Sequence, residues 1–184
     1  MGKIKIIFIF IINFIKFLFM SSITQFDRDG LVFRGCRRSE IKEAEAAYKK
    51  LAGRGFSSIH KVLLYFFSQR FLFITLSENS HKREIIGLDF YYINYRDFKD
   101  KTIHEGYIGV LPSFEGKGIA SQMRRMAKEH FKRSGFKGIS SRISIDNVAS
   151  LRSAEKVGFK PVEEYFDNDK KEKRYYLICN FINN

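Results

Sequence analysis

Residues 111–120 read LPSFEGKGIA, and the interpretation of the whole chain starts from this stretch. It follows TIHEGYIGVL (102–111), which is typical of a strand, and precedes IASQMRRMAKEHFKRSG (119–135), whose apolar residues recur at helical spacing. A strand–loop–helix order leaves backbone N–H groups unpaired at the first helical turn, where the helix dipole also favours negative charge. Gly116 and Gly118 would let an anion approach the backbone closely. This local sequence fits a phosphate-binding loop, or a tight turn whose glycines serve geometry alone.

Neither of the two common nucleotide loops is present here. A Walker A loop needs Ser or Thr after its lysine, and Lys117 is followed by Gly118. A dinucleotide-binding loop needs a third glycine where Ser121 stands. The loop therefore belongs to another class of anion site, or to none.

The rest of the chain predicts a mixed α/β domain. Apolar periodicity and glycine stops predict helices at residues 39–55, 57–69, 119–135 and 147–158. β-branched and aromatic runs predict strands at residues 31–36, 71–77, 84–95, 102–111, 138–145, 159–166 and 173–181. The elements follow one another as one strand, two helices, three strands, a helix, a strand, a helix and two strands.

A second motif follows the loop after one helix and one strand, in DNVASLRSAEKVGF (146–159). Together the two motifs resemble the GNAT superfamily of acyl-CoA-dependent N-acyltransferases. Its glycine loop, [QR]-x-x-G-x-[GA], is matched at Gly118 and Ala120. Its later helix, N-x-x-[AS]…E-K-x-G-F, is matched at Asn147, Ser150, Glu155, Lys156, Gly158 and Phe159. The resemblance covers residues 31–181 and implies a single GNAT-type domain over 26–184. That fold is a mixed, mostly antiparallel sheet flanked by helices, with a splayed central strand at the acyl-CoA site.

The resemblance also implies acetyl-CoA as the acyl donor and assigns residues to it. The pyrophosphate would bind the loop formed by Glu115, Gly116, Lys117, Gly118, Ile119, Ala120 and Ser121. The backbones of Val110 and Leu111 would hydrogen-bond the pantetheine arm, and Asn147 would contact the cofactor from the far side. The cofactor's phosphates would account for the nearby cations Lys117, Arg124, Arg125 and Lys128. Glu115 departs from the family's Gln or Arg, and a carboxylate beside a pyrophosphate is unfavourable unless it turns to solvent.

Deprotonation of the acceptor amine needs a base, which relatives commonly place eleven positions before the [QR] residue. Here that position is His104, with Glu105 beside it. Simple alternation along the strand puts His104 on the face of Ile108 and Val110, which the family turns toward pantetheine. Glu105 would face the other way unless a bulge near Gly106 or Gly109 shifts the register. His104, Glu105 or neither residue therefore serves as the base.

The group that protonates the leaving thiolate is also open. Many relatives have a tyrosine immediately before the Glu-Lys of the second motif, and Ala154 stands there. The alternatives are Ser150 or Ser153, a tyrosine from elsewhere, or water. The backbone N–H of Val110 would stabilise the oxyanion, which requires no particular side chain.

Residues 1–25 form a separate apolar segment before the predicted domain. IIFIFIINFIKFLFM (6–20) contains Asn13 and Lys16 and falls short of the roughly 20 residues that span a bilayer. It is either a short membrane anchor, an additional structured element, or untranslated sequence before a true start at Met20. Membrane contact is expected only through residues 4–20.

Charge and cysteine content limit the partners. The net charge is +13, yet no nucleic-acid-binding signature accompanies it, so we expect no nucleic-acid partner. Cys36 and Cys179 lie far apart, which indicates no metal site and a reducing, cytoplasmic location, with membrane association possible only through the apolar segment.

We predict an N-acetyltransferase that moves an acetyl group from acetyl-CoA to a primary amine by direct attack. The alternative is a degenerate acyl-CoA-binding sensor or scaffold. The sequence does not specify the acceptor or the oligomeric state.

Overall fold

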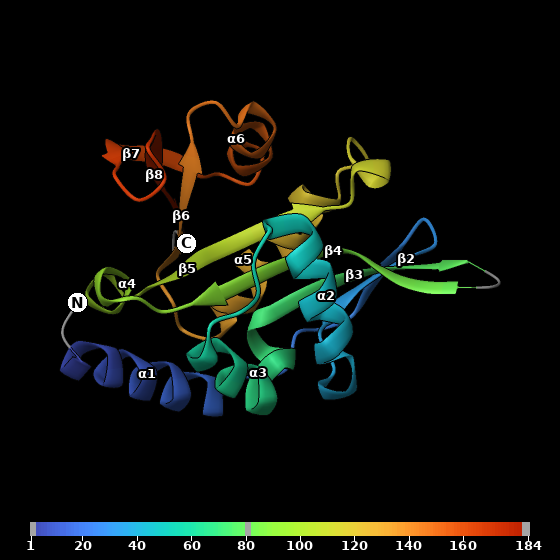
Figure 1. Cartoon of the computed structure of the whole chain (residues 1–184), viewed down its shortest axis with the longest axis horizontal. Coiled ribbons are helices and arrows are strands. Elements are labelled where there is room, and N and C mark those ends of the chain that lie inside the picture. Colours follow the sequence, from blue (N-terminus) through green and yellow to red (C-terminus); the bar gives the residue numbers. More distant parts are fainter. Residues whose placement is uncertain (1–2, 80–81, 182–184) are drawn as a thin grey trace.

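The computed structural model describes residues 3–79 and 82–181, which form an eight-stranded sheet with helices on both faces (Figure 1). The sheet order is β1-β2-β3-β4-β5-β6-β8-β7. The strands are β1 (Phe26–Arg28), β2 (Leu31–Gly35), β3 (Leu72–Asn79), β4 (Lys82–Tyr92), β5 (Thr102–Val110), β6 (Gly138–Ser144), β7 (Lys160–Asp167) and β8 (Glu172–Asn180). Every neighbouring pair is antiparallel except β5 and β6, which are parallel. This is the mixed, mostly antiparallel sheet that the sequence predicts.

Helices α2 (Ile41–Ala52) and α3 (Ser58–Phe71) cover one face of the sheet, and α5 (Ile119–Arg133) covers the other (Figure 1). A parallel pair needs a crossover connection, and α5 supplies it between β5 and β6. Helix α6 (Val148–Glu155) follows β6. The element order from β2 to β8 agrees with the prediction from sequence, apart from the short helices that the structure adds.

Local sequence explains most helix ends. Gly53 and Gly135 adopt positive φ after α2 and α5, as glycine readily does at a helix C-terminus. The Ser57 side chain accepts a hydrogen bond from the N–H of His60 and caps α3. A short helix, α4 (Tyr95–Asp100), was not predicted, and the side chain of Asn94 caps it by accepting from two N–H groups.

The parallel pair is short, and the sheet opens beyond it. β6 pairs with β5 only over Thr102–Glu105, whereas β4 accompanies β5 as far as Val110. Residues 106–110 therefore have a strand on one side only. The predicted splayed central strand is present at this point.

The apolar N-terminal segment forms helix α1 (Lys3–Leu18), which packs against α3 and α4. Phe17 is fully buried, and its ring stacks on Phe71 at a centroid distance of 4.5 Å. None of the helices within residues 3–79 and 82–181 has the length and apolar composition required to cross a bilayer. Whether translation starts before this helix or at Met20 stays a prediction.

Candidate active site

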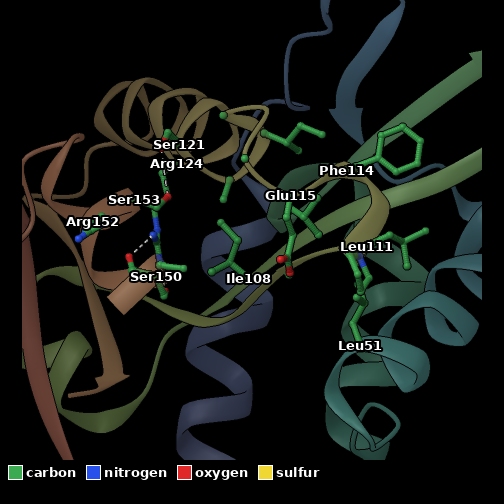
Figure 2. Close-up of a pocket in the computed structure, with 18 of the residues that line it drawn as sticks. Leu51, Ile108, Leu111, Phe114, Glu115, Ser121, Arg124, Ser150, Arg152 and Ser153 are labelled. Carbon is green, nitrogen blue, oxygen red and sulfur yellow. Dashed lines mark hydrogen bonds between the residues drawn. The ribbon is translucent and has the colours of Figure 1, made fainter. Parts of the chain in front are cut away.

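A cavity of about 700 Å³ lies where β5 and β6 part, a size typical of small-molecule sites (Figure 2). Its base is the unpaired end of β5. The glycine loop with the start of α5 forms one wall, α6 forms another, and Lys50 and Leu51 of α2 close a third side. The lining includes every predicted cofactor-binding residue except Lys117.

The glycine loop presents backbone N–H groups. Gly116 and Gly118 have φ values of +75° and +73°, and a Cβ added at either would meet nothing within 4 Å. Glycine is therefore needed at both positions for the backbone conformation rather than for close packing. No side chain caps the first turn of α5, and in the described part of the chain we find no acceptor for the N–H groups of residues 116–121. The loop has the unpaired donors and positive helix end that an anion requires.

The unpaired edge of β5 offers a second row of peptide groups. The N–H of Leu111 donates to the Ile86 carbonyl at 2.7 Å, and the Leu111 carbonyl accepts from Phe114 N–H at 2.8 Å. Alternate residues of a strand direct their peptide groups to the same neighbour, so those of Ile108 and Val110 point toward the open cleft. The structure thus corrects one expectation: Ile108 and Val110, rather than Val110 and Leu111, present free backbone groups there.

His104 does not share a face with Ile108 and Val110, so that part of the prediction is wrong. Tyr91 pairs with Glu105 while the adjacent Phe90 pairs with Tyr107, which makes Gly106 the extra residue of a β-bulge. A side chain at Gly106 would overlap the ring of Tyr92. The bulge reverses the alternation, and His104 lies on the opposite face.

The surroundings of His104 are those of a structural residue. Its Nδ1–H donates to Ser140 Oγ at 2.8 Å, and Ser140 in turn donates to Asp97 Oδ1 at 2.6 Å. Burial lowers the pKa of His104 to about 3, with Arg142 and Arg174 contributing further. The ring is neutral, only 4% exposed and outside the cavity lining, so it is not placed to take a proton from an amine in the cavity.

Glu105 does face the side of Ile108 and Val110, as the bulge alternative anticipated. Its carboxylate is nonetheless held by Arg124, whose Nε and Nη2 donate to the two oxygens at 2.7 Å each. Ser141 Oγ donates to the same carboxylate at 2.7 Å. The carboxylate is buried and does not line the cavity. Any catalytic role for Glu105 stays a prediction and would have to act through Arg124.

Arg124 is the residue whose role the sequence misassigned. It was expected among the cations facing the phosphates, but it is fully buried against Glu105. Beyond this pair it donates from Nη1 to the Ser150 carbonyl at 3.0 Å and from Nη2 to Ser150 Oγ at 3.2 Å (Figure 2). A second acid, Asp89, is buried nearby, and burial together with Glu105 holds its pKa well above the usual range. Lys128, another of the cations expected near the phosphates, donates from Nζ to the Val157 carbonyl at 3.3 Å.

The α6 wall supplies hydroxyl and amide groups. Asn147 lines the cavity, but its Oδ1 accepts from Ser150 N–H at 3.0 Å and caps α6, which leaves its Nδ2 for a ligand. Ser150 and Ser153 both line the cavity, and Ser153 Oγ lies 3.2 Å from Ser121 Oγ across to α5. Ala154 is fully buried in the core, so this position does not face the cavity.

Tyr107 is a cavity residue that the sequence analysis did not name. Burial raises the pKa of its hydroxyl to about 12, so it is protonated at neutral pH. A Cβ added at Gly109 would lie 2.6 Å from this hydroxyl, which places the Tyr107 O–H directly over the glycine. The ring meets Tyr48 of α2 edge-on at a centroid distance of 5.1 Å. No motif in the sequence singles out Tyr107. A tyrosine from elsewhere in the chain is only one of the alternatives that the sequence leaves open for protonating the thiolate.

The charge of the cavity favours an anion. Its charged lining residues are Lys50, Glu115, Arg124, Arg152 and Lys156, and Lys117 projects from the loop above Phe114. Arg124 is neutralised by Glu105, which leaves Glu115 as the acidic exception. In Figure 2 its carboxylate points from the loop toward the space between Ile108 and Leu111. Among the residues described, no group of three His, Cys, Asp or Glu could hold a metal ion.

Solved structures with the same architecture were found by comparison. The NatC complex bound to Gag peptide and CoA aligns over 83% of this chain and 99% of its own, with a TM-score of 0.70 and 21% identity. The ribosomal-protein-S5-alanine acetyltransferase of Vibrio fischeri aligns over 85% and 96%, with a TM-score of 0.67 and 19% identity. A structure from Salmonella typhimurium with its cofactor acetyl-CoA aligns over 85% and 96%, with a TM-score of 0.67 and 14% identity. At these identities the likeness establishes the fold.

The sequence itself gives the family. No curated protein sequence matches the chain significantly. The family model described as "Acetyltransferase (GNAT) family" matches residues 41–159, a range that contains both motifs and the whole cavity. The predicted cosubstrate, acetyl-CoA, agrees with the CoA and acetyl-CoA in two of the structures above. The chain belongs to the GNAT acetyltransferase family.

Proposed function

We propose that this protein transfers the acetyl group of acetyl-CoA to a primary amine by direct attack within a ternary complex. The observation that carries the proposal is the opening between β5 and β6, where the free peptide edge of Ile108 and Val110 adjoins the glycine loop. One continuous cavity thus offers donors for a pyrophosphate and a strand edge for the amide-containing pantetheine arm.

The loop residues Glu115–Ser121 would hold the pyrophosphate through their N–H groups, with Lys117 adding charge. The edge of Ile108 and Val110 would pair with pantetheine, and Nδ2 of Asn147 would donate from α6. Arg152 and Lys156 also line the α6 side of the cavity and favour an anionic ligand. The residues present therefore fit acetyl-CoA, with Glu115 as the one unfavourable group.

In the reaction the amine nitrogen bonds to the thioester carbonyl carbon, and the C–S bond then breaks. The Val110 N–H would donate to the oxyanion that forms between these steps. The amine loses a proton to water, since neither His104 nor Glu105 lines the cavity. The thiolate gains a proton, for which the candidate donors are the hydroxyl groups of the cavity residues Tyr107 and Ser150. Ser150 Oγ accepts from Arg124, so its own hydrogen is free to point elsewhere.

A polypeptide amino terminus is the acceptor class to test first. One of the matching structures holds a Gag peptide, and another is a ribosomal-protein-S5-alanine acetyltransferase. A polycation is less favoured, because the acidic residues of β7 are already paired. Glu163 pairs with Arg96, Glu164 with Lys173 and Asp167 with Arg174.

The alternative is an acyl-CoA-binding protein without catalysis, favoured by the absence of His104 and Glu105 from the cavity lining.

The test is thiol release from acetyl-CoA with short peptides, polyamines, amino sugars and free amino acids as acceptors. Release with one class would establish the activity and its acceptor. Acetyl-CoA binding in calorimetry without release on any acceptor would favour the alternative, and absence of binding would refute both.

A further inference from the structure

Helix α1 is divided lengthwise into a buried side and an exposed side. On the buried side, the Asn13 side chain makes two hydrogen bonds to the backbone of Ile93, donating at 2.8 Å and accepting at 2.7 Å. Phe17 is buried against α3, and Arg70 holds the carbonyl of Leu18 at 2.7 Å. These contacts fix the helix on the domain and determine which side faces outward.

The exposed side of α1 is apolar and continues onto α3. Phe66 of α3 contacts Phe14 of α1 at a ring-centroid distance of 5.8 Å, so the outer surfaces of the two helices adjoin. We call this surface the α1–α3 face. Its exposed apolar members are Ile4, Ile7, Ile11, Ile15, Leu18, Phe19, Val62, Tyr65 and Phe66. So many large apolar side chains together exceed the scattered exposure that is usual on a monomer.

Helices α1 and α3 themselves carry basic residues but no acidic ones. Residues 4–25 contain Lys5 and Lys16 but no Asp or Glu, and residues 46–77 likewise contain no Asp or Glu. Lys5 and Lys16 of α1 are exposed, and the Arg38 guanidinium lies 3.6 Å from the ring centre of Tyr65 at the edge of the face. Helix α4, which packs against α1, carries the exposed Asp100, which lies 3.8 Å from Arg96, and Glu45 of α2 pairs with Lys61 at 2.8 Å.

We propose that the α1–α3 face rests on an anionic lipid surface, with α1 lying in the membrane plane. At about 1.5 Å per residue a 16-residue helix is roughly 24 Å long, and it is fixed to the domain along its length rather than free to insert. An apolar stripe bordered by lysines and lacking acids is the pattern of an interfacial helix. The structure extends the predicted contact of residues 4–20 to include α3.

A second copy of the chain is a poorer occupant of this face. Two-fold pairing would bring the same patch of each copy together, which places the lysines and arginines of both copies around one apolar contact. Anionic headgroups would instead attract these cations and neutralise their charge. In Figure 1 α1 lies at the opposite edge of the molecule from α6 and the glycine loop, so the cavity would stay open to solvent.

The first experiment is flotation of the full chain with vesicles of phosphatidylcholine alone or with 30% phosphatidylserine. We expect at least tenfold stronger partitioning to the anionic vesicles, weakened by 0.5 M NaCl. Phe66→Glu should reduce partitioning about tenfold or more. The control is Phe166→Glu, because Phe166 on β7 is 57% exposed, as Phe66 is, but lies outside the α1–α3 face.

A second experiment reports depth and orientation. The chain contains no Trp, so Ile11→Trp and Phe166→Trp each introduce a single fluorophore at an exposed site. Emission of the first variant should shift to shorter wavelength on anionic vesicles, whereas emission of the second should not change. Equal partitioning to both vesicle types, equal shifts in both variants, or a vesicle-insensitive dimer that Phe66→Glu dissociates would each overturn the proposal.

Discussion

Arg124 and Glu105 form a buried, two-point ion pair at the place where β5 and β6 separate. Both contacts are 2.7 Å, and each side chain is at most 2% exposed. Ser141 of β6 donates to the carboxylate, and Ser150 of α6 accepts from the guanidinium. Residues of β5, β6, α5 and α6 thus meet at one pair. The pair closes the inner end of the cleft and holds the α6 wall at a fixed distance from β5.

Arg124→Met should destabilise the protein by roughly 3–5 kcal/mol, because it leaves the Glu105 carboxylate buried without its cationic partner and near Asp89. Arg124→Met combined with Glu105→Gln should recover much of that loss. Chemical unfolding of the two variants measures the difference, with Arg125→Met as the control at an exposed neighbouring position. Equal stability of the single and double variants would show that the pair contributes no more than its packing.

This pair also shows why sequence could predict the fold but only part of the site. Strand and helix periodicity gave the element order, and two motifs gave the loop and the α6 wall. The bulge at Gly106 has no periodic signature, so the alternation placed His104 and Glu105 on the wrong faces. Arg124 lies three residues before Ala127 and seven before Phe131, on the buried side of α5, yet an arginine without a known partner was interpreted as a surface cation. Only the tertiary contact with Glu105 explains its burial.

Gly118→Glu should weaken acetyl-CoA binding at least about tenfold, because it adds bulk and negative charge where the pyrophosphate would lie. Gly53→Glu is the matched control. Both glycines have positive φ, +73° and +67°, with nothing within 4 Å of an added Cβ, so both variants carry the same backbone strain. Calorimetric titration of folded protein compares them. Similar losses of affinity in both variants would attribute the effect to strain and remove the loop from the cofactor site.

Glu115→Gln should strengthen acetyl-CoA binding about two- to tenfold at low salt, since it removes one exposed negative charge beside the phosphates. The gain should shrink as salt rises. Glu129→Gln, at an exposed position near the far end of α5, is the control. Weaker binding by Glu115→Gln would mean that the carboxylate contributes a contact with the cofactor or the amine.

Stability should fall as the pH drops from about 7 toward 4. Burial lowers the pKa of His104 to about 3 and those of His60 and His130 to about 4. An unfolded histidine has a pKa near 6.5, so between these values the unfolded state binds more protons and is favoured. Each histidine contributes a slope of about 1.4 kcal/mol per pH unit. Thermal unfolding across this range should show a shallower slope for His104→Gln, and an unchanged slope would mean that His104 is protonated in the folded protein.

Tyr107→Phe should lower kcat by roughly a hundredfold, while the affinity for acetyl-CoA changes little, because proton donation by a positioned side chain typically contributes a factor of this size. Tyr107 lines the cavity, and its hydroxyl is protonated at neutral pH and packs over Gly109. Gly109→Ala should displace it and lower kcat in the same direction. His104→Gln should leave kcat within about threefold, because the ring lies outside the cavity lining. Steady-state rates with the best acceptor compare the three variants. A large loss of kcat in His104→Gln with Tyr107→Phe unaffected would reverse this assignment and require the strand to change register when acetyl-CoA binds.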